Sequence, residues 1–172
     1  MSIRTTLALS ALAVLATACA SVDGGSPYPL PPTGAPSSAF SAEDFAWSTR
    51  TGQGGVDGRV AYRSGGLAYD CTGSVALTPD TPYTRARFRT LYGSTEQAAI
   101  PEAVVRARTV SDPNADYRSF VRSATCSDGR FAFSGLPDGG WFIIVPVNAG
   151  GGDRTVLMRH VNTRSGRIAV TL

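Results

Sequence analysis

The sequence predicts an all-β domain, a sandwich or a barrel of antiparallel strands, and three observations support this prediction. Short segments alternate apolar and polar residues with a period of two, which is typical of half-buried antiparallel strands. Turn signals such as Asp128-Gly129 and Ser165-Gly166 separate these segments about every ten residues. Long stretches of helical periodicity are missing. We therefore expect a single β domain over residues 42–172.

Up to nine segments carry the strand pattern, and one of them predicts the centre of the fold. The segments are 56–62, 73–79, 83–92, 102–110, 117–126, 129–136, 140–147, 154–161 and 166–172. The run from Trp141 to Val147 is apolar throughout, which indicates a central strand covered on both faces. Phe131 and Phe133 lie two residues apart and should share the face that points to the core.

A short helix is expected to open the domain. Ser41 is suited to be its N-cap, and Glu43 and Asp44 would lie in its first turn. Phe45 and Trp47 should then pack against the domain as its first anchor.

The first residues resemble the signal sequence of a bacterial lipoprotein. Arg4 precedes an apolar stretch over 7–15, which is too short to cross a membrane as a helix. Ala16-Thr17-Ala18 then leads to Cys19. The resemblance implies a signal peptide over 1–18, a lipid on Cys19 and, because Ala20 follows, sorting to the outer membrane. The alternative is ordinary secretion after cleavage at the A-x-A site that residues 16–18 provide.

Residues 19–41 predict an extended tether between that lipid and the domain. Proline, glycine and serine dominate this stretch, which cannot bury enough apolar surface to order itself. We expect the tether to hold the domain near the outer membrane, facing the periplasm or the cell surface.

Two further cysteines, Cys71 and Cys126, predict a structural disulfide. Exported chains meet an oxidising compartment, where an even pair of cysteines is expected to be bonded. No C-x-x-C motif occurs, and neither cysteine has a histidine nearby in the sequence. The alternative is a pair of buried free thiols.

The segment from Asp128 to Trp141 resembles a hairpin of the carboxypeptidase regulatory-like, or transthyretin-like, domain. Its sequence DGRFAFSGLPDGGW follows that family's pattern, and Gly58-Arg59-Val60 and residues 75–79 match the family's earlier strands. The resemblance covers about 56–147, and the long middle section 81–110 departs from it. It implies a single Ig-like, transthyretin-like antiparallel β-sandwich, in which Leu136 closes one end.

Residues suited to catalysis or to metal binding are scarce. His160 is the only histidine, no G-x-S-x-G elbow accompanies it, and an exposed or edge-strand position is the simpler interpretation. A zinc site needs three or four histidine or cysteine ligands, and most carboxylates lie beside glycine or proline in turns. The Asp- and Asn-rich loops lack the ligand spacing of an EF-hand. We expect no metal, no cofactor and no enzymatic activity; a hydrolase of unfamiliar type is the least favoured function.

Arginines at alternating positions predict one basic sheet face if segments 83–92 and 102–110 are neighbouring strands. The residues are Arg85, Arg87, Arg89, Arg106 and Arg108. Such a face could bind phosphate or carboxylate groups. A solvated face whose arginines pair with acids on neighbouring strands is the preferred interpretation.

These patterns favour a non-enzymatic, lipid-anchored module of the cell envelope with a structural or interaction role. Its partners would be the membrane, through the lipid, and an envelope protein or glycan. The alternative is a glycan-binding module, for which Tyr83, Tyr92 and Tyr117 are candidate platforms. A nucleic-acid partner is not expected, because the net charge is only +3 and the chain carries an export signal.

Overall fold

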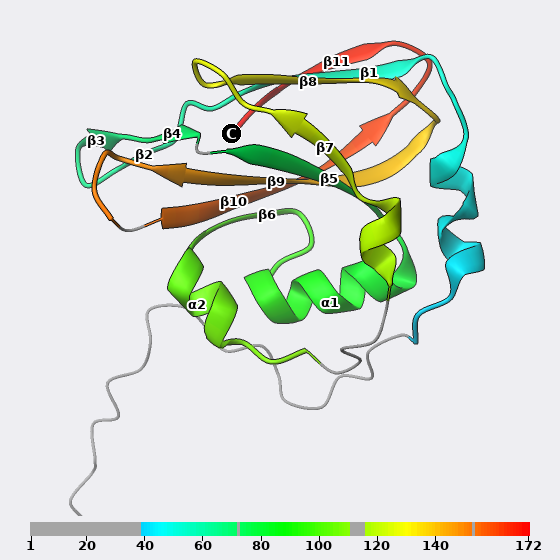
Figure 1. Cartoon of the computed structure of the whole chain (residues 1–172), viewed down its shortest axis with the longest axis horizontal. Helices are drawn as coiled ribbons and strands as arrows, with labels where there is room; N and C mark the ends of the chain where they lie inside the picture. The colour runs from blue at the N-terminus through cyan, green and yellow to red at the C-terminus, as the bar shows by residue number, and fades with distance from the viewer. Residues whose placement is uncertain (1–38, 72, 111–115, 153) are drawn as a thin grey trace, which may run out of the picture.

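Two β-sheets pack face to face, and two α-helices cover the outer face of the larger sheet (Figure 1). The computed structural model describes residues 39–71, 73–110, 116–152 and 154–172. The predicted signal peptide, Cys19 and most of the predicted tether therefore lie outside the described residues.

The smaller sheet has the strand order β11-β1-β8, and the larger has the order β6-β10-β9-β5-β7 with β4 also paired to β9. Their bounds are β1 Gly54–Arg59, β4 Asp70–Cys71, β5 Ser74–Pro79, β6 Gln97–Pro101, β7 Arg122–Thr125, β8 Arg130–Leu136, β9 Gly139–Asn148, β10 Arg154–Thr163 and β11 Arg167–Thr171. A separate hairpin joins β2 (Arg63–Ser64) to β3 (Leu67–Ala68). Among the described strands, β1 and β11 pair in parallel and the other pairs are antiparallel. The prediction of an all-β sandwich is confirmed.

Segment 83–92 is a helix, so its predicted strand is wrong. Helix α1 (Pro82–Tyr92) begins with a capping box between Thr81 and Thr84, has Pro82 in its first turn and ends at Gly93 in the left-handed region. The buried side chains Thr84, Phe88 and Tyr92 recur every four residues and form the face that packs on the sheet. Arginines at alternating positions are compatible with a helix, because arginine has a high helix propensity.

Segment 102–110 is also not a strand. Its first part is helix α2 (Glu102–Ala107), which Glu102 and Arg106 support as an ion pair four residues apart. Segment 117–126 divides into a 3-10 turn, η2 (Tyr117–Phe120), and β7. The predicted opening helix is confirmed as the 3-10 helix η1 (Ala42–Thr49), although the Ser41 side chain makes no cap hydrogen bond.

Strand β9 lies in the middle of the larger sheet and carries the two main layers of the core. Trp141, Ile143, Val145 and Val147 point to the smaller sheet, and Phe142 points to the helices. All five are fully buried. A strand buried on both faces is what the continuous apolar run predicts. Phe131 and Phe133 enter the layer between the sheets, as predicted, and Leu136 is buried in the same layer.

Gly58 of the Gly-Arg-Val motif makes room for a core aromatic ring. It lies directly opposite Phe131 on the neighbouring strand β8. A Cβ at this position would overlap the Phe131 ring, which is itself buried and cannot move aside freely. The pairing of glycine with aromatic residue therefore fixes how β1 and β8 meet.

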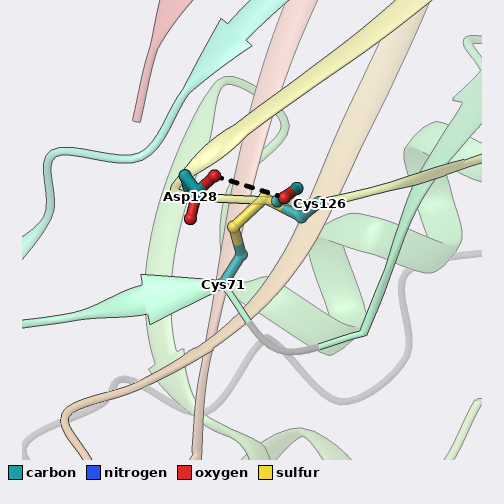
Figure 2. The surroundings of a disulfide bond; sticks show 4 residues. Cys71, Cys126 and Asp128 are labelled. Atoms are coloured by element: carbon teal, nitrogen blue, oxygen red, sulfur yellow. Dashed lines mark hydrogen bonds between the residues drawn. A yellow bond between two sulfur atoms is a disulfide. The ribbon is translucent and has the colours of Figure 1, made fainter.

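The predicted disulfide is present between Cys71 and Cys126 (Figure 2). Their Cα atoms are 6.1 Å apart, and 55 residues separate them in the sequence. Cys71 ends β4, which pairs with β9, and Cys126 follows β7, which pairs with β5. The bond thus ties two short peripheral strands of the larger sheet to each other.

Arg122 holds the opening helix against the sandwich. Its guanidinium donates to the carbonyl oxygens of Ser48 at 2.8 Å and Gly135 at 3.2 Å, and it lies 5.5 Å from the centre of the Trp141 ring. Burial lowers the pKa of Arg122. Trp47 packs on the same Trp141 ring, with the ring centres 5.0 Å apart, so its predicted anchoring role is confirmed.

Candidate functional site

An open groove lies where the smaller sheet ends short of the edge of the larger one. The core between the sheets includes buried residues from β5, β9 and β10, whereas β6 contributes only the half-buried Ala99 among the described residues. Two adjoining hollows of about 780 Å³ and about 330 Å³ occupy this region, and both are lined by Tyr62 and Ala99. The mismatch between a three-stranded sheet and a wider one therefore leaves accessible sheet surface.

Cross-strand pairs of β6 and β10 form the floor of this groove. The pairs are Pro101 with Thr155, Ala99 with Leu157, and Gln97 with Arg159. Their side chains share the inner face because the six positions alternate with Ala98, Ile100, Val156 and Met158, which pack toward the helices. The floor is apolar in its centre, has a threonine hydroxyl at one end and an arginine at the other, and extends for about 14 Å along the strands.

Two tyrosines from the β2–β3 hairpin form a wall of the groove. Gly65 and Gly66, both with positive φ, make the two-residue turn of this hairpin. Tyr62 and Tyr69 flank the hairpin, where the Tyr69 amide donates to the Tyr62 carbonyl at 3.0 Å. Their rings meet edge to face with centres 5.1 Å apart, and both side chains are half-buried. The tight turn thus presents two partly open aromatic rings beside the floor.

A charged cluster closes the end of the groove beside α2. Glu102 Oε1 accepts a hydrogen bond from Arg106 and forms an ion pair with it. Glu102 Oε2 lies 3.8 Å from Arg154. Arg106 and Arg154 are 75% and 52% exposed, so both remain open to solvent. One carboxylate therefore faces two arginines.

Four of the five arginines predicted to share one sheet face lie on two helices, and Arg108 follows the second helix. Alternate positions on a helix differ by about 200° in direction. Arg85 pairs with Asp80, Arg87 lies 4.9 Å from the centre of the Tyr117 ring, and Arg89 is exposed. The structure thus does not bring them together as the sequence pattern predicted.

The remaining two arginines of that set lie in the last turn of α2 and directly after it. Arg106 lines the groove, as described above. Arg108 donates from Nη1 to the Leu91 carbonyl at 2.6 Å and so connects the end of α2 to α1. Of the predicted anion-binding residues, only Arg106 belongs to the groove among the described residues.

The tyrosines predicted as sugar platforms lie elsewhere. Tyr83 and Tyr92 are core residues with 1% and 8% exposure, and burial raises the pKa of Tyr92. Tyr117 is half-buried beside α1, where it contacts Arg87 and Arg118. The aromatic residues of the groove are Tyr62 and Tyr69, which sequence reasoning missed. Their symmetric placement around the Gly65-Gly66 turn is the signal that could have found them.

His160 is neither exposed nor on an edge strand. It lies on β10 between β6 and β9, its side chain is 9% exposed, and its Nε2 lies 2.8 Å from Asp80 Oδ2. Arg85 pairs with the same carboxylate oxygen, and the Asp80 side chain is 8% exposed. The cluster connects the end of β5 to β10 and α1, and we interpret it as a structural network.

The described residues contain no group of three or more histidine, cysteine, aspartate or glutamate side chains that could hold a metal ion. No helix within the described ranges is long and apolar enough to cross a membrane.

Comparison with known proteins finds a similarity of fold. No protein-family model matches the chain, and no curated protein sequence matches it. A solved structure from Pseudomonas aeruginosa, named a "putative carbohydrate binding protein", superposes with a TM-score of 0.50 and 23% sequence identity. The alignment covers 77% of this chain and 97% of the other. At this level of identity the similarity shows a shared β fold.

Proposed function

We propose that this protein is a non-catalytic binding module of the bacterial cell envelope and that its ligand is a glycan. The observation that carries the proposal is the groove beside β6, with an apolar floor and the partly open rings of Tyr62 and Tyr69. Pyranose rings pack their C–H faces on aromatic rings, and their hydroxyls bond to polar groups at the edge of such a site. The groove offers both kinds of contact.

The polar groups stand at the ends of the groove, where sugar hydroxyls could reach them. Gln97 and Arg159 lie at one end of the floor, and Thr155 lies near the other end. The two adjoining hollows are open to solvent, which suits a chain ligand better than a small molecule enclosed on all sides. The name of the Pseudomonas aeruginosa protein with a similar fold agrees with a sugar ligand.

The proposed location is the outer membrane, through a lipid on Cys19. The support is the sequence of the first residues, with small side chains before the cysteine and a proline- and glycine-rich stretch after it. In this arrangement the tether would give the domain access to envelope polymers.

The experiment that tests this function measures binding of the purified full-length protein to immobilised glycans, neutral and acidic. The variant Tyr62→Ala should lose most of the binding, because it removes the ring shared by both hollows. Tyr117→Ala removes a half-buried tyrosine outside the groove and is the matched control, which should bind like the wild type. Circular dichroism melting curves verify that both variants fold. Equal binding by the two variants, or no binding by the wild type to any glycan, would contradict the proposal.

A further inference from the structure

We infer that the ligand of this groove is an acidic glycan, whose carboxylates bind arginines at the two ends of the floor. This inference rests on the proposed glycan-binding function and adds the chemical class of the ligand. The residues that carry it are Arg154 and Arg106 at one end and Arg159 at the other.

Positive side-chain charge exceeds negative charge in the groove. Three arginines line the two hollows, and Glu102 is the one acidic side chain that lines them among the described residues. Surface arginines are commonly neutralised by nearby acids, which leaves little attraction for a ligand. Here the described side chains that line the groove carry a net charge of +2.

Arg154 is the arginine that is most open to a ligand at the α2 end. Glu102 uses Oε1 for the hydrogen bonds from Nε and Nη2 of Arg106, whereas Oε2 is 3.8 Å from Arg154. At that distance no hydrogen bond forms, so the guanidinium of Arg154 keeps its donors for another acceptor. A carboxylate placed beside it would accept two parallel hydrogen bonds, as arginine favours.

Arg159 occupies the opposite end and has a neutral partner. Its Nη1 donates to Gln97 Oε1, which orients the guanidinium but does not neutralise it. Within the part of the chain that the structure describes, no carboxylate forms an ion pair with Arg159. An oriented guanidinium with no ion-pair partner among the described residues is suited to bind a second carboxylate.

The separation of the two ends favours a chain over a compact anion. Arg159 and the Thr155 end of the floor are four residues apart on β10, which corresponds to about 14 Å. Ala99 and Leu157 lie between them and offer no charge. One phosphate or sulfate cannot reach both ends, whereas a polysaccharide with carboxylates on successive or alternate sugars can, with Tyr62 packing on a ring between them.

The test compares ligands first. Purified full-length protein is titrated with polygalacturonate, hyaluronate and peptidoglycan sacculi, and with the neutral polymers dextran, β-glucan and chitin. Acidic polymers should bind, and the same acidic polymers with their carboxylates chemically reduced to alcohols should bind at least tenfold more weakly. Binding should also weaken between 0.05 and 0.3 M salt, because screening shortens the range of the attraction to below about 10 Å.

Single variants then locate the charge. Arg154→Gln and Arg159→Gln should each weaken binding of the tightest acidic polymer by about two- to fivefold, which corresponds to the loss of one exposed charge pair. Arg164→Gln removes the same charge from an exposed position after β10 and should leave binding unchanged.

Each outcome decides between the two proposals. If neutral and carboxyl-reduced polymers bind as well as acidic ones, the inference of an acidic ligand is wrong, and the glycan-binding function stands. If all three arginine variants weaken binding equally, net charge and not the groove determines it, which also overturns the inference. If no polymer binds, both proposals are wrong.

Discussion

At the scale of single residues, the features that organise the fold are contacts between positions far apart in the chain. Asp80 and His160 are 80 residues apart, yet their side chains meet at 2.8 Å in a nearly closed site. Arg85 joins them from the first turns of α1. Asp80 Oδ1 is buried without a hydrogen-bond partner among the described residues. Local sequence patterns do not predict such a contact, because it depends on the order of the strands in the sheet.

The Asp80 carboxylate should stabilise the fold. Asp80→Asn removes the carboxylate that His160 and the partly exposed Arg85 share, and the loss of these contacts should cost about 1–2 kcal/mol. Urea denaturation measures the loss in free energy of unfolding. Arg89→Gln, at an exposed position on the helix that carries Arg85, serves as control. Its free energy of unfolding should stay within about 0.5 kcal/mol of the wild type. If Asp80→Asn is as mild as the control, the network has no structural role.

Gly58 should not tolerate a side chain. Gly58→Ala places a methyl group into the Phe131 ring, and overpacking of this kind costs about 1–3 kcal/mol. The double variant Gly58→Ala, Phe131→Leu should recover part of the loss, because the smaller side chain vacates the space. Gly151→Ala, where no atom lies within 4 Å of the added carbon, is the matched control. Additive losses in the double variant would argue against this direct contact.

At the scale of elements, the strands follow from the sequence better than the helices do. The continuous run Trp141–Val147 and the alternation around Phe131 and Phe133 predict β9 and β8, because burial on one or two faces imposes these patterns. Segment 83–92 alternates too, and yet it is α1. Thr81-Pro82 at its start and Gly93 at its end are the helix signals, and they predict this segment better than the alternation of its arginines does.

Only part of the groove could be predicted from the sequence, for the same reason. Tyr62 and Tyr69 flank a Gly-Gly turn, so a pair of facing tyrosines could be predicted locally. Their position beside Arg106 and Arg154 could not, because it requires β6 to pair with β10 and α2 to follow β6 at the edge of the sheet. Long-range strand order, and not local pattern, creates the site.

The disulfide should contribute substantially to the stability of the sheet edge. Replacing both cysteines, with Cys71→Ala and Cys126→Ala, opens a loop of 55 residues in the unfolded chain and should cost about 4 kcal/mol. Denaturation of the double variant and of the wild type, with and without reductant, measures this effect. Reductant should lower wild-type stability and leave the variant unchanged. Two thiols that react with an alkylating reagent in unreduced native protein would show that the bond is absent in the cell.

At the scale of the whole molecule, the proposed lipid on Cys19 would anchor a domain whose described part has an open groove at one sheet edge. The sandwich protects its core on both sides of β9, through the smaller sheet and through α1 and α2 (Figure 1). The edge beside β6 stays open, and there the aromatic and charged side chains gather. We expect the domain to act as a rigid binder and not to change shape on binding, since the floor belongs to a paired β ladder.

A substitution of Cys19 tests the proposed lipid attachment. Cys19→Ser should abolish metabolic labelling with a radioactive fatty acid and should leave unprocessed precursor in the membrane fraction. Cys71→Ala, which keeps Cys19, should still be labelled. If Cys19→Ser matures normally to a soluble periplasmic protein, ordinary secretion is the correct interpretation.

The central claim is that the groove beside β6 is the binding surface, and backbone amide NMR tests it most directly. The full-length protein is titrated with the tightest-binding soluble glycan of the panel, and shifts are followed for each amide. The largest amide shift changes should fall in residues 97–101 and 154–159 and in the hairpin between Tyr62 and Tyr69. Changes concentrated on α1, or on the outer face of the smaller sheet, with the groove unaffected, would contradict it.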